Sequence, residues 1–322
     1  MNFHIVHTTE YEYSAAAIES YTELRVRPRN TLRQVVSHHL TEITPRVPLE
    51  VFIDYYGNWV EFLSVPFRHK RLIVTSRSAV QTRAYQDALS GLDLTISEAV
   101  HLCWPQRREL YDFLMPSLHA PVLPEIEEIA RQHLPPKAPF APAILSLNEW
   151  LFREFTYESG VTDISTPVSE VIANRKGVCQ DFAHLMIAVL RSAGLPARYV
   201  SGYIETDADA HTSLNGAPPP PAPEPSEDST RLIGATASHA WVEVFTPSGH
   251  WVGLDPTNNL MEGERHVQIG IGRDYADVSP LRGVFKGAEQ QLLSVKVTVS
   301  RAEELRNEQD ELTGSGLGPF LD

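Results

Sequence analysis

The first 84 residues alternate between hydrophobic and polar positions with the period of two that is typical of half-buried β-strands. Short groups of Pro, Gly and Asn separate these runs, and Tyr56-Gly57-Asn58 between two of them indicates a hairpin. We expect strands over residues 3–13, 22–28, 35–43, 51–56, 59–65 and 72–80. Several short strands at even spacing predict an N-terminal β-sandwich or open barrel over residues 1–84.

The pattern then changes to helical spacing. Seven prolines between positions 116 and 142 divide residues 85–142 into short pieces, which predicts a helical connector whose helix beginning at Pro124 has Pro in its first turn. From residue 143 a first helix is followed by a short one, which Thr166-Pro167 would open and Gly177 would close. A longer helix is predicted over 178–193, where Gly194 and Pro196 stop it.

Five strand-like runs follow the helices, at 198–204, 238–245, 251–254, 267–271 and 292–299. Helices followed by strands, without βαβ alternation, are typical of an α+β domain, which we place at residues 143–302. An acidic, Pro-rich stretch at 206–234 interrupts it, and we expect this insertion and the acidic tail at 303–322 to be disordered.

Charge changes this picture little. The formal net charge is −14, but residues 205–230 hold −6 and residues 301–322 hold −4, so the rest of the chain carries only −4. An acidic chain of this kind argues against a nucleic-acid partner, and no apolar run is long enough for a transmembrane helix. Because the N-terminus lacks the unbroken apolar stretch of a signal peptide and only two cysteines occur, we expect a cytoplasmic protein with free thiols.

Cys179 is the first candidate for chemistry. It lies at the start of the helix predicted over 178–193, where unpaired backbone N–H groups and the positive end of the helix dipole favour a thiolate. Phe182, Ala183 and Met186 belong to the buried stripe of the same helix, so the sulfur points towards whatever that helix packs on. A small buried cysteine without chemistry is an equally good interpretation of this position alone.

His239 favours the chemical interpretation. It lies in a predicted strand, and the returning strand carries Asp255. If a loop of three or five residues connects them, the numbers of facing residues sum to 494, which places His239 directly opposite Asp255, whereas a loop of two or four residues would put them out of register. In the first case a thiolate, an imidazole and an orienting carboxylate come together, as acyl transfer requires.

The same segments resemble the transglutaminase-like superfamily. Gly-Val-Cys-Gln-Asp-Phe-Ala-His, His-Ala-Trp-Val-Glu-Val and Trp-Val-Gly-Leu-Asp-Pro-Thr occur in the order of its core motifs, and residues 1 to about 80 are similar to the N-terminal domain associated with bacterial transglutaminases. The resemblance implies a papain-like α+β core in which Cys179 is the nucleophile, His239 the general base and Asp255 the orienting acid. The 206–234 insertion departs from the family pattern and is either a passive linker or a substrate gate.

These observations predict an enzyme that acts on an amide bond of a peptide or protein through a thioester on Cys179, without a cofactor or metal. We favour hydrolysis, because water is always present and no acidic amine-binding pocket can be recognised in the sequence. Two alternatives stay open: transamidation of the protein-glutamine gamma-glutamyltransferase type, and a catalytically silent binding protein on the same fold. We expect neither a nucleic-acid nor a membrane partner.

Overall fold

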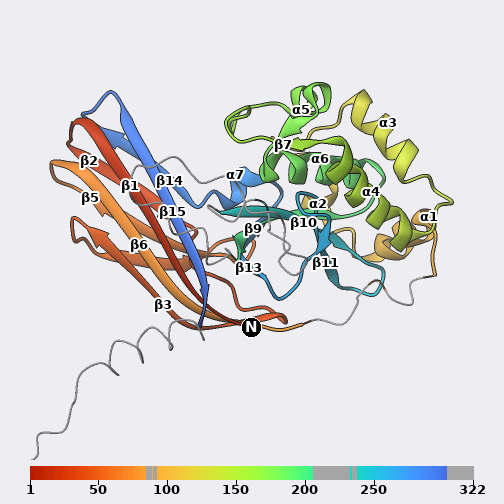
Figure 1. Ribbon diagram of the computed structural model, residues 1–322, viewed down its shortest axis with the longest axis horizontal. Helices are drawn as coiled ribbons and strands as arrows, with labels where there is room; N and C mark the ends of the chain where they lie inside the picture. Colours follow the sequence, from red (N-terminus) through yellow and green to blue (C-terminus); the bar gives the residue numbers. More distant parts are fainter. Residues whose placement is uncertain (85–88, 90–92, 206–232, 234–237, 303–322) are drawn as a thin grey trace, which may run out of the picture.

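The computed structural model describes residues 1–84, 89, 93–205, 233 and 238–302, and it has a β-rich half and a half in which helices cover a sheet (Figure 1). All six predicted N-terminal strands are present. They are β1 (Asn2–Ala17), β2 (Glu19–Leu24), β3 (Gln34–Thr44), β4 (Leu49–Ile53), β5 (Trp59–Val65) and β6 (His69–Thr82). Buried and exposed residues alternate along β1, as its sequence predicts, and Gly57 has a φ of 78° in the turn between β4 and β5.

Two C-terminal strands complete the β-rich half. β14 (Leu281–Lys286) and β15 (Gln291–Arg301) join sheets with the strand orders β14-β2-β5-β4 and β15-β1-β6-β3. β15 pairs antiparallel with β1 from Phe3↔Arg301 to Tyr13↔Gln291, and Figure 1 shows both blue strands beside the red ones. The strand predicted at 292–299 therefore exists, but it pairs with the N-terminal sheet and not with the domain at 143–302. A period of two identifies a strand without identifying its partner.

The second half is built around one buried helix, α6 (Cys179–Ser192). The other helices are α1 (Ile96–Cys103), η1 (Trp104–Gln106), α2 (Tyr111–Leu114), α3 (Pro124–His133), α4 (Phe140–Glu154), α5 (Val168–Asn174) and α7 (Tyr275–Val278). Side chains of α1, α3, α4 and α5 share one hydrophobic core with α6. The segment predicted as a connector, 85–142, therefore supplies part of the helical layer over the sheet.

The sheet of this half has the strand order β12-β11-β10-β9-β13. Its strands are β9 (Ala197–Ile204), β10 (His239–Phe245), β11 (Trp251–Asp255), β12 (Leu260–Met261) and β13 (His266–Gly272), and a short parallel pair, β7 (Thr156–Tyr157) and β8 (Lys176–Gly177), precedes α6. Ala240, Val242 and Val244 of β10 pack in the same core as α6. The expected α+β architecture, an antiparallel sheet covered by a cysteine-bearing helix, is confirmed.

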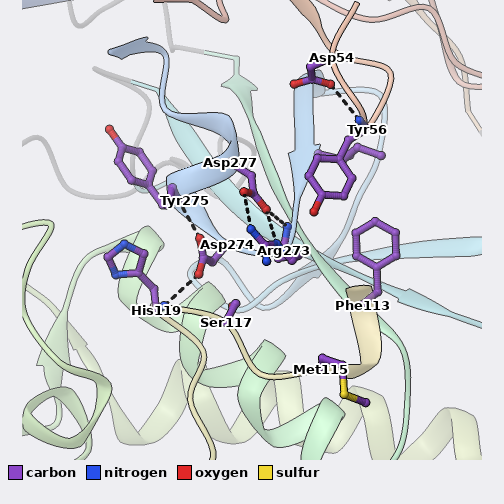
Figure 2. Close-up of polar contacts among 12 residues, drawn as sticks. Asp54, Tyr56, Phe113, Met115, Ser117, His119, Arg273, Asp274, Tyr275 and Asp277 are labelled. Atoms are coloured by element: carbon purple, nitrogen blue, oxygen red, sulfur yellow. Dashed lines mark hydrogen bonds and ion pairs between the residues drawn. The ribbon is translucent and has the colours of Figure 1, made fainter. Parts of the chain in front are cut away.

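Buried hydrogen bonds from Arg191 stabilise the C-terminal end of α6. The Arg191 side chain donates to the carbonyl oxygens of Phe113, Met115, Ala197 and Arg273 and to Ser117 Oγ, at 2.7–3.2 Å. Around this point Arg273 pairs with Asp277, and Asp274 Oδ2 accepts the backbone N–H of His119 (Figure 2). Burial lowers the pKa of Arg191 to about 10, so it stays charged at neutral pH. These bonds hold α6 in place and with it Cys179 at the other end.

The predicted disorder of residues 206–234 and 303–322 lies outside the described residues, apart from Ile233. Among the helices that the structure describes, none has the length and apolar character needed to cross a membrane.

Candidate active site

Cys179 is the first residue of α6, as predicted, and its side chain is 8% exposed. The start of this helix is held by Asp181, whose Oδ2 accepts the backbone N–H of Val178 at 2.8 Å and the Thr162 hydroxyl at 2.7 Å. A Cβ on Gly177 would lie 2.8 Å from that oxygen, which is closer than Cβ atoms approach other atoms. Glycine therefore lets the chain pass close to Asp181 on its way to the cysteine.

His239 is the first residue of β10 and is 1% exposed. The loop to β11 has five residues, one of the two lengths that the sequence analysis required, with Phe245 facing Trp251 and Val242 facing Leu254. The numbers of facing residues thus sum to 496, so the predicted pairing of His239 directly opposite Asp255 is wrong by two positions. A shift of two keeps side chains on the same face, and His239 Nε2 still reaches Asp255 Oδ2, at 2.8 Å, across a diagonal.

Asp255 is fully buried, and its carboxylate accepts five hydrogen bonds. The backbone N–H groups of Thr257 and Asn258 donate to Oδ1 at 3.0 and 3.3 Å. The Asn258 amide, His239 and His266 contact Oδ2 at 2.8, 2.8 and 3.2 Å. Burial alone would raise the pKa of Asp255, but the charge of His239 and the hydrogen bonds of both histidines hold it well below its ordinary value. This carboxylate is ionised.

The charge of Asp255 determines the protonation state of His239. Burial lowers the pKa of His239, but the Asp255 carboxylate and, less strongly, Cys179 outweigh it, and the pKa is raised to about 10. His239 is therefore an imidazolium at neutral pH. Its Nε2 contacts Asp255, whereas its Nδ1 is buried without a hydrogen-bond partner of good geometry.

Cys179 is one of the groups that raise the pKa of His239, so its sulfur lies near the imidazole. Two tyrosines also lie near it: burial, and then the charge of Cys179, raise the pKa values of Tyr157 and Tyr199. The structure thus brings together all three residues that the sequence singled out, in the order Cys179, His239, Asp255. This arrangement can form a thiolate–imidazolium pair that a buried carboxylate stabilises.

His266 and Asn258 both contact the Asp255 carboxylate, and neither was among the residues predicted from the sequence. Asp255-Pro256-Thr257-Asn258 carries a local signal for the second contact, because an Asp side chain often accepts backbone N–H groups two and three residues further on. No local pattern identifies His266, since it reaches Asp255 from an edge strand on the other side of the sheet.

The ligand-type atoms of His239, Asp255 and His266 lie within 4.8 Å of one another, which raises the question of a metal. The hydrogen bonds account for this cluster. His266 Nδ1 lies 3.2 Å from the backbone nitrogen of Gly263, and because a backbone N–H can only donate, Nδ1 is an acceptor and the ring proton is on Nε2. Both imidazoles therefore contact Asp255 as donors, so we interpret the cluster as a hydrogen-bond network.

The second cysteine lies elsewhere. Cys103 is buried against Leu110 and Phe245, and burial raises the pKa of its thiol to about 11. Both cysteines are free thiols, as expected.

Comparison with known protein families gives two matches along this chain. Residues 127–256 match the transglutaminase-like superfamily, and residues 3–81 match the bacterial transglutaminase-like N-terminal region. A protein from Cytophaga hutchinsonii that has been proposed to be a cysteine protease has a crystal structure similar to this chain, with a TM-score of 0.67 and 20% identity over 100% of this chain and 94% of that one. At this identity the likeness concerns the fold alone.

Two sequence relatives extend the comparison. The protein-glutamine gamma-glutamyltransferase of Pseudomonas aeruginosa is 29% identical over 163 residues, which are 48% of this chain and 22% of that enzyme. An uncharacterized protein of Mycobacterium tuberculosis is 37% identical over 305 residues, which are 92% of each chain. With a core match over residues 127–256 and the bacterial transglutaminase-like region at residues 3–81, this chain belongs to the transglutaminase-like superfamily.

Proposed function

We propose that this protein is a cysteine enzyme that cleaves an amide bond of a peptide or protein, with Cys179 as nucleophile, His239 as acid and base, and Asp255 as the group that orients His239. One observation carries the proposal. His239 is bonded at 2.8 Å to the ionised carboxylate of Asp255, and Cys179 lies close enough to His239 to help raise the pKa of its imidazole. A histidine with only a structural role would not require both a buried thiol and a fully buried carboxylate nearby, and this combination therefore supports a chemical role for His239.

The reaction begins when the Cys179 thiolate attacks the amide carbonyl carbon, and backbone N–H groups at the start of α6 help to hold the oxyanion. The His239 imidazolium gives its proton to the leaving amine as the C–N bond breaks, which leaves a thioester on Cys179 and a neutral imidazole. A water molecule then transfers a proton to His239 and attacks the thioester. The C–S bond then breaks and the carboxylic acid is released, which restores the Cys179 thiolate beside the His239 imidazolium.

An amine that replaces water in the last step would give transamidation with the same residues. The likeness to the Pseudomonas aeruginosa glutamyltransferase favours this alternative, although the match covers only 22% of that enzyme. We prefer hydrolysis, since water needs no binding site. A silent binding protein is the least favoured alternative, because it would have no use for the ion pair between His239 and Asp255.

The first experiment measures how fast iodoacetamide alkylates each cysteine between pH 5 and 10, by mass spectrometry of digested protein. We expect Cys179 to react rapidly already near pH 6, because the imidazolium of His239 stabilises its thiolate. Cys103, buried and without a charged partner, is the internal reference, and an exposed cysteine in a short peptide is the external one. If Cys179 follows the alkaline profile of the peptide, the proposed nucleophile is wrong.

The second experiment identifies the acceptor of the acyl group. The wild-type protein and the Cys179→Ala variant are incubated with a peptide library, with and without a primary amine, and product masses are recorded. Cleaved or deamidated peptides that Cys179→Ala does not produce would support hydrolysis. Amine-dependent adducts that have lost ammonia would instead establish transfer. Activity that persists in Cys179→Ala would contradict both, and a Cys103→Ser variant should leave the products unchanged.

A further inference from the structure

His266 is a buried histidine that takes no direct part in the proposed thiol chemistry. It is the first residue of the edge strand β13, is 4% exposed, and has its Nε2 3.2 Å from Asp255 Oδ2. Because its Nδ1 accepts the backbone N–H of Gly263, the proton on Nε2 is fixed and points to the carboxylate. His266 is thus a second imidazole donor on the oxygen that His239 uses.

The surroundings of His266 keep it in this role. Its ring packs edge-to-face against Trp241, with centroids 5.2 Å apart and planes at 73°, and lies 6.3 Å from the ring of His239. The charged groups near it are Asp255 on β11, His239 on β10 and its own neighbour Arg265. Burial, together with His239 and Arg265, lowers the pKa of His266 despite the opposing effect of Asp255, so the ring stays neutral near pH 7.

The two histidines reach Asp255 from different parts of the sheet. In the order β12-β11-β10-β9-β13, His239 comes from the strand next to Asp255, whereas His266 comes from the opposite edge. A carboxylate held from one side can turn about its side-chain bonds. A second donor of fixed tautomer removes that freedom, and it leaves Oδ2 aimed at His239.

We propose that His266 is a positioning residue, whose Nε2–H holds the Asp255 carboxylate in the orientation at which it stabilises the His239 imidazolium. This inference rests on the proposed function, since it concerns the reactivity of Cys179. In metal sites, loss of a hydrogen bond that orients a ligating side chain costs roughly 10- to 100-fold in affinity or activity, and we expect an effect at the lower end of that range here.

The test compares His266→Phe, which fills the space but cannot donate, with His266→Gln, whose amide nitrogen can occupy the place of Nε2. The rate of Cys179 alkylation by iodoacetamide is measured from pH 4 to 9, with Cys103 as reference in the same digest. For His266→Phe we expect the acid limb of reactivity to move up by about one pH unit, which is about tenfold at fixed pH on that limb. His266→Gln should return the limb to within about 0.3 units of the wild type.

Thermal unfolding of both variants separates positioning from mere stability. If the acid limb stays in place in His266→Phe, or moves equally in both variants while both melt early, the positioning role is wrong. Loss of Cys179 reactivity when the wild type is dialysed against a chelator would assign the three residues to a metal and also overturn it. If Cys179 of the wild type shows no unusual reactivity, the proposed function itself is wrong. That result comes from the wild type alone and is therefore distinct from a failure of the positioning role, which only the variants can show.

Discussion

Asp255 is the residue on which the electrostatics of the site depend. It is fully buried, yet five hydrogen bonds and the charge of His239 keep it ionised, and it is the chief cause of the raised pKa of His239. Without that charge, burial would make His239 a neutral imidazole at pH 7, which could not stabilise a thiolate. The carboxylate thus determines whether His239 carries the positive charge that the proposed function requires of it.

Replacing Asp255 by Asn should therefore change how stability depends on pH. In the wild type, His239 has a pKa of about 10, against about 6.5 when unfolded, so its contribution is complete below about pH 6.5 and is lost as the pH rises towards 10. In Asp255→Asn that contribution is absent. We expect the difference in unfolding free energy between the two proteins, from urea unfolding at pH 6, 8 and 10, to shrink steadily as the pH rises.

The control is Glu128→Gln, which removes a half-exposed carboxylate from α3 and should show a small, pH-independent difference. The same Asp255→Asn protein should also lose at least about tenfold in Cys179 alkylation at pH 7. A difference in stability that stays constant from pH 6 to 10 would show that Asp255 does not raise the pKa of His239.

At the scale of single elements, α6 shows what sequence signals can predict. The expected range of 178–193 differs from the observed Cys179–Ser192 by one residue at each end, because an apolar stripe, the turn at Gly194 with a φ of 80°, and Pro196 all act locally. The preceding helix, α5, was predicted less well. It ends at Asn174, because the next residue, Arg175, has a φ of 53°, and it does not extend to Gly177.

Gly177 has a different role, which depends on a contact that the local pattern does not contain. It pairs with Tyr157 in the short parallel sheet and passes close to the Asp181 side chain. The register of β10 and β11 was missed by two for a similar reason, since the composition of the turn does not determine where pairing begins. Local chemistry and the family resemblance singled out Cys179, His239 and Asp255 as candidates, but neither contains the tertiary contacts that orient these side chains.

Gly177→Ala should therefore destabilise the start of α6. The new Cβ would lie 2.8 Å from Asp181 Oδ2 and 2.9 Å from Asp181 Cβ, so the carboxylate that caps the helix must move. We expect a loss of about 1–3 kcal/mol of unfolding free energy in urea, together with slower alkylation of Cys179. Gly263→Ala is the matched control, because its Cβ would meet only Met261 O, at 3.9 Å. Equal unfolding free energies of the two variants would show that the Asp181 side chain can move away from the new Cβ without loss of stability.

At the scale of the whole molecule, the two halves are joined at the edge of the second sheet. Gln34 and Asn58, both buried in the N-terminal half, bind the backbone of β13 as a neighbouring strand would. The Gln34 amide donates to Gln268 O at 2.7 Å and accepts from Gln268 N at 2.8 Å. Asn58 does the same with Ile271, at 2.8 and 2.9 Å. These side chains satisfy backbone groups that an edge strand otherwise leaves unpaired.

Long-range organisation of this kind was the least predictable part of the fold. The hydrophobic pattern identified a strand near residue 292 and a β-rich N-terminus, but only the folded chain shows that β15 pairs with β1 across the length of the protein. No sequence pattern predicted that the side-chain amides of Gln34 and Asn58 would bind the backbone of β13 in place of a neighbouring strand. In both cases the partner is hundreds of residues away, and periodicity carries no information about it.

The joint at β13 leads to a last prediction. In the double variant Gln34→Met/Asn58→Leu, the N–H groups of Gln268 and Ile271 and the C=O of Ile271 lose their side-chain partners, whereas Gln268 O keeps the N–H of Arg29. Each such loss in a buried place costs roughly 1–3 kcal/mol. We expect the amides of residues 266–272 to exchange hydrogen at least about tenfold faster in mass spectrometry, since 1.4 kcal/mol corresponds to a factor of ten. Asn30→Ala is the control, because Asn30 is exposed and bonds only Val36 N of its own half. Unchanged protection of β13 would mean that the edge strand of the second sheet is stable without the side chains of the N-terminal half. A loss of protection that includes the amide of His266 would show that the N-terminal half also stabilises the strand whose His266 side chain contacts Asp255.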